Sequence, residues 1–177
     1  MNIDNFTTPL GIITLTIFFN GQPAATITNK AISTFIESPN VTIEVIAFEN
    51  FAEWMKETIY PVEKTKGWII RITKNTDDIE AVKLNCLLKS EEVEITGDPD
   101  GGQHLDAISF ENKTHCLSIG TEDGEVVKYR AVHNDYIPTR FAKDLGYSSK
   151  EFSFTTYLKL GLETTIPELK KGEEVYF

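Results

Sequence analysis

Cysteine is scarce in this sequence of 177 residues. The two cysteines, Cys86 and Cys116, stand thirty positions apart, and there is no C-x-x-C pair. A disulfide framework and a zinc ribbon both need more cysteines at closer spacing. We therefore expect two ordinary reduced thiols, with neither a disulfide nor a zinc centre.

Targeting signals and long hydrophobic runs are absent as well. Residues 1–4 lack the basic stretch of a signal peptide. The apolar run at 10–19 is interrupted by threonines and is too short to span a bilayer. These features predict a cytoplasmic protein without a membrane partner.

Catalytic motifs are also missing. The sequence has no G-x-S-x-G elbow, Walker loop, G-x-G-x-x-G or H-E-x-x-H motif. We expect no cofactor and favour a protein without catalysis. The enzymatic alternative, which the sequence leaves open, is an active site assembled from residues such as His133, Asp135, Tyr136 and Arg140.

His115 and Cys116 place a base beside a nucleophile, but their adjacency argues against a catalytic dyad. Neighbouring residues of a strand point to opposite faces of a sheet, so these two side chains cannot hydrogen-bond to each other. The alternation around them puts His115 on the apolar face. We therefore expect a core histidine whose ring nitrogens are satisfied.

The loop from Asp98 to Asp106 has three carboxylates and one imidazole, an oxygen-rich set that could hold a hard cation. An EF-hand loop needs an oxygen ligand at its fifth position and glycine at its sixth, where this loop has Gly102 and Gln103. The twelfth position is Ser109 and not glutamate. We therefore predict a solvated turn and no metal site.

Basic residues are few in the middle of the chain, whose formal charge is −10 overall. Residues 77–125 hold thirteen acidic side chains against Lys83, Lys89 and Lys113, an excess equal to the charge of the whole chain. A field of this sign repels nucleic-acid phosphates and anionic lipid surfaces and attracts a basic partner. Solubility without any partner is the alternative explanation.

The sequence is rich in short alternations of apolar and polar residues, the pattern of half-buried strands. Turn-forming residues separate these runs at short intervals. The predicted strands are 12–19, 24–28, 41–48, 68–72, 78–89, 93–96, 107–111, 115–120, 125–132 and 152–162. A helix is the alternative for 78–89, because Asp77 and Glu80 resemble a capping pair.

Turn residues predict two hairpins. After Asn20 and Gly21, one extra loop residue would pair Ile17 with Ala25 and keep apolar side chains on one face, so we expect a three-residue loop or a bulge. Residues 122–124 form the second loop, which would pair strand 115–120 with 125–132. Gly161 is expected to bend or bulge the last strand.

Two short helices complete the predicted fold. Apolar residues recur on one helical face of 50–60, and Pro61 ends that helix. Pro138 and Gly146 bracket a second helix at 138–145. The sequence thus predicts one α+β domain over 1–177, predominantly antiparallel β: a twisted sheet, or an open barrel or sandwich of short strands.

The charge distribution leads to a functional hypothesis. We expect a protein-binding domain that docks a basic protein, as an acidic inhibitor or immunity protein does. The alternative is a small enzyme or a small-ligand-binding β-fold with a pocket between sheet and helix. The oligomeric state stays open. The expected partner-binding residues are acidic side chains in two turn clusters: Glu91, Glu92, Glu94, Asp98, Asp100, Asp106, Glu122, Asp123 and Glu125.

Overall fold

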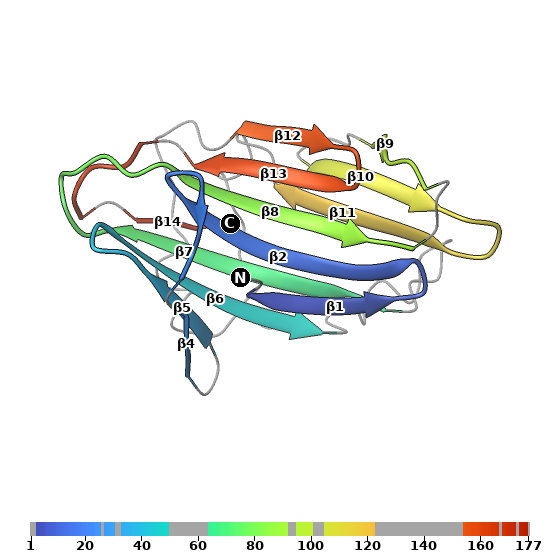
Figure 1. The fold of residues 1–177 in the computed structure, drawn as a ribbon, viewed down its shortest axis with the longest axis horizontal. Coiled ribbons are helices and arrows are strands. Elements are labelled where there is room, and N and C mark those ends of the chain that lie inside the picture. Colours follow the sequence, from blue (N-terminus) through green and yellow to red (C-terminus); the bar gives the residue numbers. More distant parts are fainter. Residues whose placement is uncertain are drawn as a thin grey trace.

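The computed structural model shows a protein built of antiparallel β-strands (Figure 1). It describes residues 3–25, 27–30, 33–49, 64–91, 95–100, 105–122, 154–166, 168–172 and 174–176. All regular structure in these ranges is β-strand, arranged in three sheets. Within them the sheets are open and do not close into a barrel. The predicted predominance of antiparallel β is confirmed, whereas both predicted helices, 50–60 and 138–145, lie outside the described residues.

The largest sheet has six strands, and each pairs antiparallel with its neighbours. Five of them follow the order β1-β2-β8-β13-β12, and β3 pairs with the end of β2. Their bounds are β1 (Asp4–Thr8), β2 (Gly11–Phe19), β3 (Gln22–Pro23), β8 (Val82–Lys89), β12 (Phe154–Leu158) and β13 (Gly161–Ile166).

Two smaller sheets lie against this one. The first has the order β14-β7-β6-β5-β4, with β14 (Glu174–Tyr176), β7 (Lys66–Lys74), β6 (Val41–Glu49), β5 (Ser33–Glu37) and β4 (Ile27–Lys30). The second has the order β11-β10-β9, with β11 (Cys116–Glu122), β10 (Leu105–Glu111) and β9 (Asp98–Pro99).

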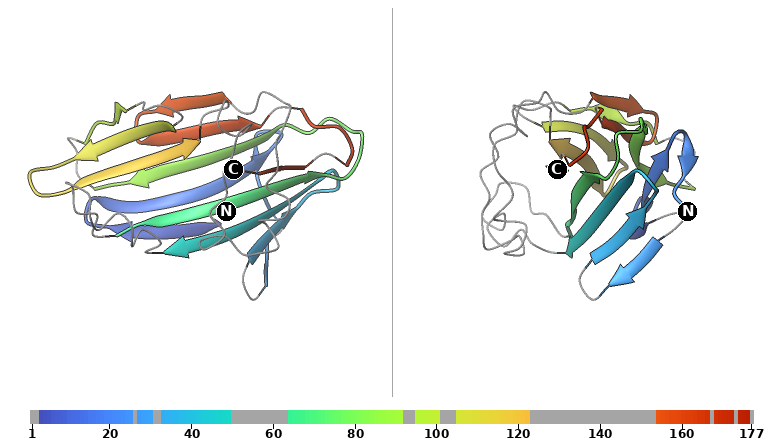
Figure 2. Two further views of the ribbon diagram at one scale, coloured as in Figure 1. Left: turned by 180° about the vertical axis from the view of Figure 1, so that it is seen from behind. Right: turned by 90° about the vertical axis from the view of Figure 1, so that its left-hand side faces the viewer.

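Two apolar cores join the sheets into layers, which Figure 2 shows from behind and from one end. Alternation along β2 turns Ile13 and Ile17 to the same inner face, and each belongs to a different core. Ile17 packs with residues of the five-stranded sheet such as Ile43, whereas Ile13 packs with residues of the three-stranded sheet such as Ile108. Trp68 contacts both cores. The six-stranded sheet therefore forms one layer that the two smaller sheets share.

Two hairpins of the same design flank β8. The β1–β2 turn ends in Leu10 and Gly11, and the β12–β13 turn ends in Leu160 and Gly161. Both glycines have positive φ, +138° and +156°. A Cβ atom at Gly11 would lie 2.3 Å from the carbonyl oxygen of Lys89, and one at Gly161 would lie 2.0 Å from another β8 carbonyl oxygen. Glycine is thus needed where each hairpin meets β8.

The prediction of one long strand over 152–162 is wrong. Residues 154–158 and 161–166 are two strands, joined by a turn at Lys159 and Leu160. Apolar alternation continues through this turn, so hydropathy alone does not reveal it. The position of Gly161 is its only sequence signal, because a glycine inside a strand pattern also indicates a bulge.

The expected three-residue loop after β2 is also wrong. Phe19 pairs with Gln22 across a two-residue turn, in which Asn20 and Gly21 have φ of +49° and +79°. These left-handed conformations suit the tight turns that an Asn-Gly pair favours. The return strand, β3, has only two residues, so the apolar pairing that argued for a longer loop never forms.

Other strand predictions are largely confirmed. Strands at 41–48, 68–72 and 107–111 lie within β6, β7 and β10, and β8 settles the ambiguous segment in favour of a strand from Val82. Residues 95 and 96 of the predicted strand 93–96 are not in a strand. The predicted strand 125–132, and with it the second predicted hairpin, lies outside the described residues. The observed neighbour of β11 is β10.

Candidate functional site

Strand pairing brings the two acidic turn clusters to the same small sheet. Leu105 is opposite Glu122, and Asp106 is opposite Thr121, in the antiparallel pair of β10 and β11. On the other side of β10, Ser109 is opposite Asp98. Segments that are up to 24 residues apart in the sequence, as Asp98 and Glu122 are, thus meet in one sheet.

The described carboxylates do not all lie on one face of that sheet. Asp106 shares its face with Ile108, which is buried in the core. Asp98, Asp100 and Glu111 are exposed and alternate onto the opposite face. We call Asp98, Asp100 and Glu111, together with the hydroxyls between them, the acidic sheet face.

Two serines link the acidic sheet face. The Ser109 hydroxyl donates to Oδ2 of Asp100 at 3.4 Å and lies 2.8 Å from the hydroxyl of Ser118. The strands themselves, with the sequences DP, LDAISFE and CLSIGTE, contain no Lys, Arg or His. No cation within these three strands therefore offsets their carboxylates.

Glu111 was not among the predicted partner-binding residues. Alternation with Ile108 and Phe110 already points its side chain away from the core, but no sequence pattern places it beside Asp98 and Asp100. The register of β10 with β9, in which Ser109 is opposite Asp98, puts Glu111 on the same face as that carboxylate.

Asp106 has a different environment, at the junction with the six-stranded sheet. The hydroxyl of Tyr157 on β12 donates to Oδ1 of Asp106 at 3.1 Å. Burial and this hydrogen bond to a carboxylate both raise the pKa of Tyr157. Tyr157 as a whole residue is still 37% exposed. Asp106 therefore ties two sheets together at the molecular surface.

The remaining predicted partner-binding residues are only partly described. Glu91 is exposed just after β8, and the backbone of Glu122 ends β11. The other four, which lie outside the described residues, are Glu92, Glu94, Asp123 and Glu125. His133, Asp135, Tyr136 and Arg140, the residues of the enzymatic alternative, are also outside them.

The two cysteines and His115 have different environments. Both thiols are free, and burial raises the pKa of Cys86 to about 12, which keeps it protonated at neutral pH. Cys116 is exposed. The expectation of a core histidine is wrong: His115 is exposed, and its Nδ1 lies 2.8 Å from the Thr114 hydroxyl. It precedes β11 and belongs to a turn, where strand alternation no longer sets the direction of a side chain.

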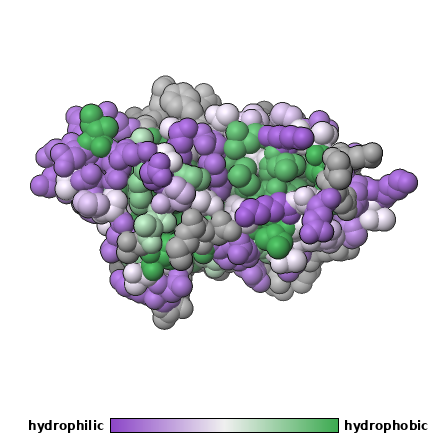
Figure 3. Space-filling model, viewed as in Figure 1, coloured by the Kyte–Doolittle hydropathy of each residue, from purple (hydrophilic) through white to green (hydrophobic). Residues whose placement is uncertain are grey.

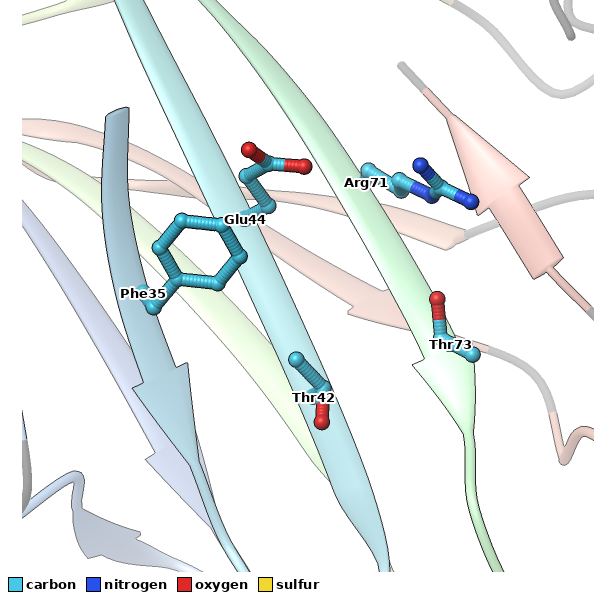
Figure 4. A pocket seen from close by; sticks show the side chains of 5 residues that line it. All are labelled: Phe35, Thr42, Glu44, Arg71 and Thr73. Carbon is cyan, nitrogen blue, oxygen red and sulfur yellow. The ribbon is translucent and has the colours of Figure 1, made fainter. Parts of the chain in front are cut away.

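A pocket of about 120 Å³ lies on the face of the five-stranded sheet that turns away from the core. Figure 4 shows its lining, in which the Phe35 ring lies beside the Glu44 carboxylate and Arg71 lies on the next strand. Thr42 and Thr73 supply hydroxyls. Glu44 is only 6% exposed, and it is opposite Arg71 in the register of β6 and β7. Sequence reasoning missed this pocket, because Thr42 and Glu44 read as the solvated face of strand 41–48.

Comparison with known proteins gives no identification. No family model, no curated protein and no solved structure matches this chain. Within the described ranges there is no helix with the length and apolar character needed to cross a membrane.

Proposed function

We propose that this chain is a non-catalytic binding protein whose acidic sheet face docks a basic surface of a partner protein, as an inhibitor or immunity protein does. One observation carries the proposal. The pairing of β9, β10 and β11 unites the two acidic segments in a sheet whose strands contain no cationic residue.

Physical chemistry connects this arrangement with docking. Several carboxylates on an ordered sheet create a negative electrostatic field, which speeds the encounter with a positively charged protein. Ser109 and Ser118 add hydroxyls that can hydrogen-bond to a docked guanidinium or ammonium group. The same field repels phosphate backbones, which makes nucleic acid an unsuitable partner.

The test is a pull-down of basic proteins from cells that naturally contain this chain. We expect Asp98→Asn/Asp100→Asn to weaken capture at low salt by about fivefold, because exposed charge pairs each contribute modestly. Added salt should abolish most of the difference, since about 0.15 M salt screens exposed charges beyond roughly 8 Å.

The matched control is Glu37→Gln/Glu168→Gln. Both residues are exposed, and the change in net charge is the same. The control should bind like the wild type. Equal weakening in the two double variants would show that net charge alone matters. If neither double variant weakens capture, the acidic sheet face takes no part in the interaction.

A further inference from the structure

The connection between β7 and β8, residues 75–81, presents an isolated apolar side chain to solvent. Ile79 is 73% exposed, more than any other large hydrophobic residue in the described part of the chain. Its loop neighbours Asp77 and Asp78 are exposed too. Figure 3 shows a small apolar spot inside a hydrophilic region at the end of the molecule where β7 leads into β8. We call residues 75–81 the Ile79 loop.

The two ends of the Ile79 loop are fixed by other turns. At its start, the Asn75 backbone N–H donates to the carbonyl oxygen of Asn40 at 2.8 Å. At its end, the Ala81 N–H donates to Oδ1 of Asn20 at 3.0 Å, and the Asn20 N–H donates back to the Ala81 carbonyl at 2.8 Å. Two hairpin turns from different sheets therefore hold the loop.

Side chains fix the middle of the loop as well. The Thr76 hydroxyl donates to Oδ1 of Asn40 at 2.8 Å, and the Ser38 hydroxyl donates to the Glu80 carboxylate. The ammonium group of Lys74, a buried residue, donates to the carbonyl oxygen of Asp78. The backbone on both sides of Ile79 is thus held before any partner arrives.

The hydrogen bonds that hold its loop distinguish Ile79 from an ordinary exposed apolar residue. Single exposed apolar side chains are common and need no explanation by themselves. A mobile loop would lose conformational entropy when it docks, whereas a loop that is already ordered avoids most of that loss. An isoleucine on such a support is a suitable anchor for a pocket in another protein.

The charges around Ile79 indicate the chemistry of that pocket. Asp78 and Glu80 flank Ile79 directly, and the exposed Asp77 precedes Asp78, whereas the charge of Lys74 is buried beneath the loop. Lys170 and Lys171 are exposed on the neighbouring turn, whose Gly172 N–H donates to the Lys74 carbonyl. The carboxylates next to the anchor therefore favour a rim of basic residues on the partner.

We propose that the Ile79 loop is a second docking surface, which inserts Ile79 into an apolar socket with a basic rim on a partner protein. The loop lies at the opposite end of the long axis from the β10–β11 hairpin (Figure 1). The proposal uses none of the residues of the acidic sheet face and stands whether or not that face binds a partner.

The test compares capture by immobilised wild type and Ile79→Ser from a lysate of the source cells at 150 mM salt. Proteins that the variant loses are purified, and their affinities for each variant are measured. Ile79→Ser should bind at least about tenfold more weakly, as expected for truncation of an anchor, and Ile79→Val should stay within about fivefold of the wild type.

Ile12→Ser is the matched control, because Ile12 is also exposed, at 43%, but lies on a sheet face. It should leave the affinity unchanged, and equal thermal denaturation of the variants should show that all are folded. Unchanged capture by Ile79→Ser would overturn the proposal. So would wild-type self-association that Ile79→Ser abolishes, since it would assign the loop to a second copy of the chain.

The two proposals fail separately. Loss of binding in Asp98→Asn/Asp100→Asn with normal binding in Ile79→Ser would reject the Ile79 loop alone. The reverse result would reject the acidic sheet face and leave the Ile79 loop as the docking surface.

Discussion

At the scale of single residues, the most consequential polar contact ties β1 to β7 across two sheets. Oδ2 of Asp4 accepts a hydrogen bond from the Trp68 indole N–H at 2.9 Å. The same oxygen forms an ion pair with the Lys66 ammonium at 2.6 Å. The Lys66 side chain is only 7% exposed, and Glu49 lies 3.4 Å from its ammonium. A lysine buried to this degree depends on its carboxylate partners.

Asp4 should therefore make stability depend on pH. Burial alone would raise the pKa of Asp4, but the hydrogen bonds from Lys66 and Trp68 outweigh it and lower the pKa below the usual 3.8. The stabilisation is present above pH 3.8 and is lost as pH falls through the lowered value. We expect Asp4→Asn to lower the free energy of unfolding by about 1–2 kcal/mol at pH 7.

Urea denaturation of the wild type and Asp4→Asn between pH 7 and pH 2 measures this dependence. The difference between the two proteins should shrink as the pH falls below 3.8. Asp98→Asn, at an exposed position, is the control and should change little. A difference that stays constant over the whole range would show that the Asp4 charge does not contribute.

At the scale of elements, the close approach of the β12–β13 hairpin to β8 should make Gly161 indispensable. A Cβ atom there would lie 2.0 Å from the carbonyl oxygen of Cys86 and 2.9 Å from Cα of Leu87. We expect Gly161→Ala to lower the free energy of unfolding by about 3 kcal/mol, from steric overlap and backbone strain together.

Gly21→Ala provides the comparison, because Gly21 has φ of +79° but no atom within 4 Å of the added Cβ. This variant tests the backbone conformation without steric overlap and should lose only about 1 kcal/mol. Thermal denaturation of both variants measures the two losses. Equal losses would mean that the contact with β8 is not what requires glycine at 161.

The elements also show what a sequence can predict. Local alternation was sufficient for β6, β7 and β10, because each buries one face against a core, but it left a helix open for β8. It failed at Gly161 and after Asn20, where turns interrupt or replace an apolar pattern that would otherwise continue. The predicted strand 24–28 reaches only the first two residues of β4, and β5 was missed, because its buried residues Ser33 and Ile36 do not alternate.

At the scale of the whole molecule, the order of the strands could not be predicted from the sequence. The acidic sheet face exists because β9 and β11 both pair with β10. The sequence pattern assigned β11 to a hairpin with 125–132, and no local pattern marks the pairing of β10 with β9. The pocket near Glu44 likewise needs three strands in register. The charge excess at 77–125 could be counted, but only the register shows that Asp106 and Asp98 are on different faces.

The shared layer predicts how the molecule unfolds. β2 and β8 run through both cores, so loss of either core should destabilise the strands on which the other is built. Ile17 is fully buried in one core, and Ile108 is nearly so in the other. We expect Ile17→Ala and Ile108→Ala each to lower the free energy of unfolding by about 2–5 kcal/mol.

Both variants should keep one cooperative urea transition. Tryptophan fluorescence, to which Trp68 at the junction of the cores contributes, and far-ultraviolet circular dichroism should give the same midpoint. If Ile108→Ala instead shifts an early transition and leaves a later one in place, the three-stranded sheet unfolds independently. The six-stranded sheet would then not couple the two cores, and the acidic sheet face would be attached to a separately folding part of the molecule.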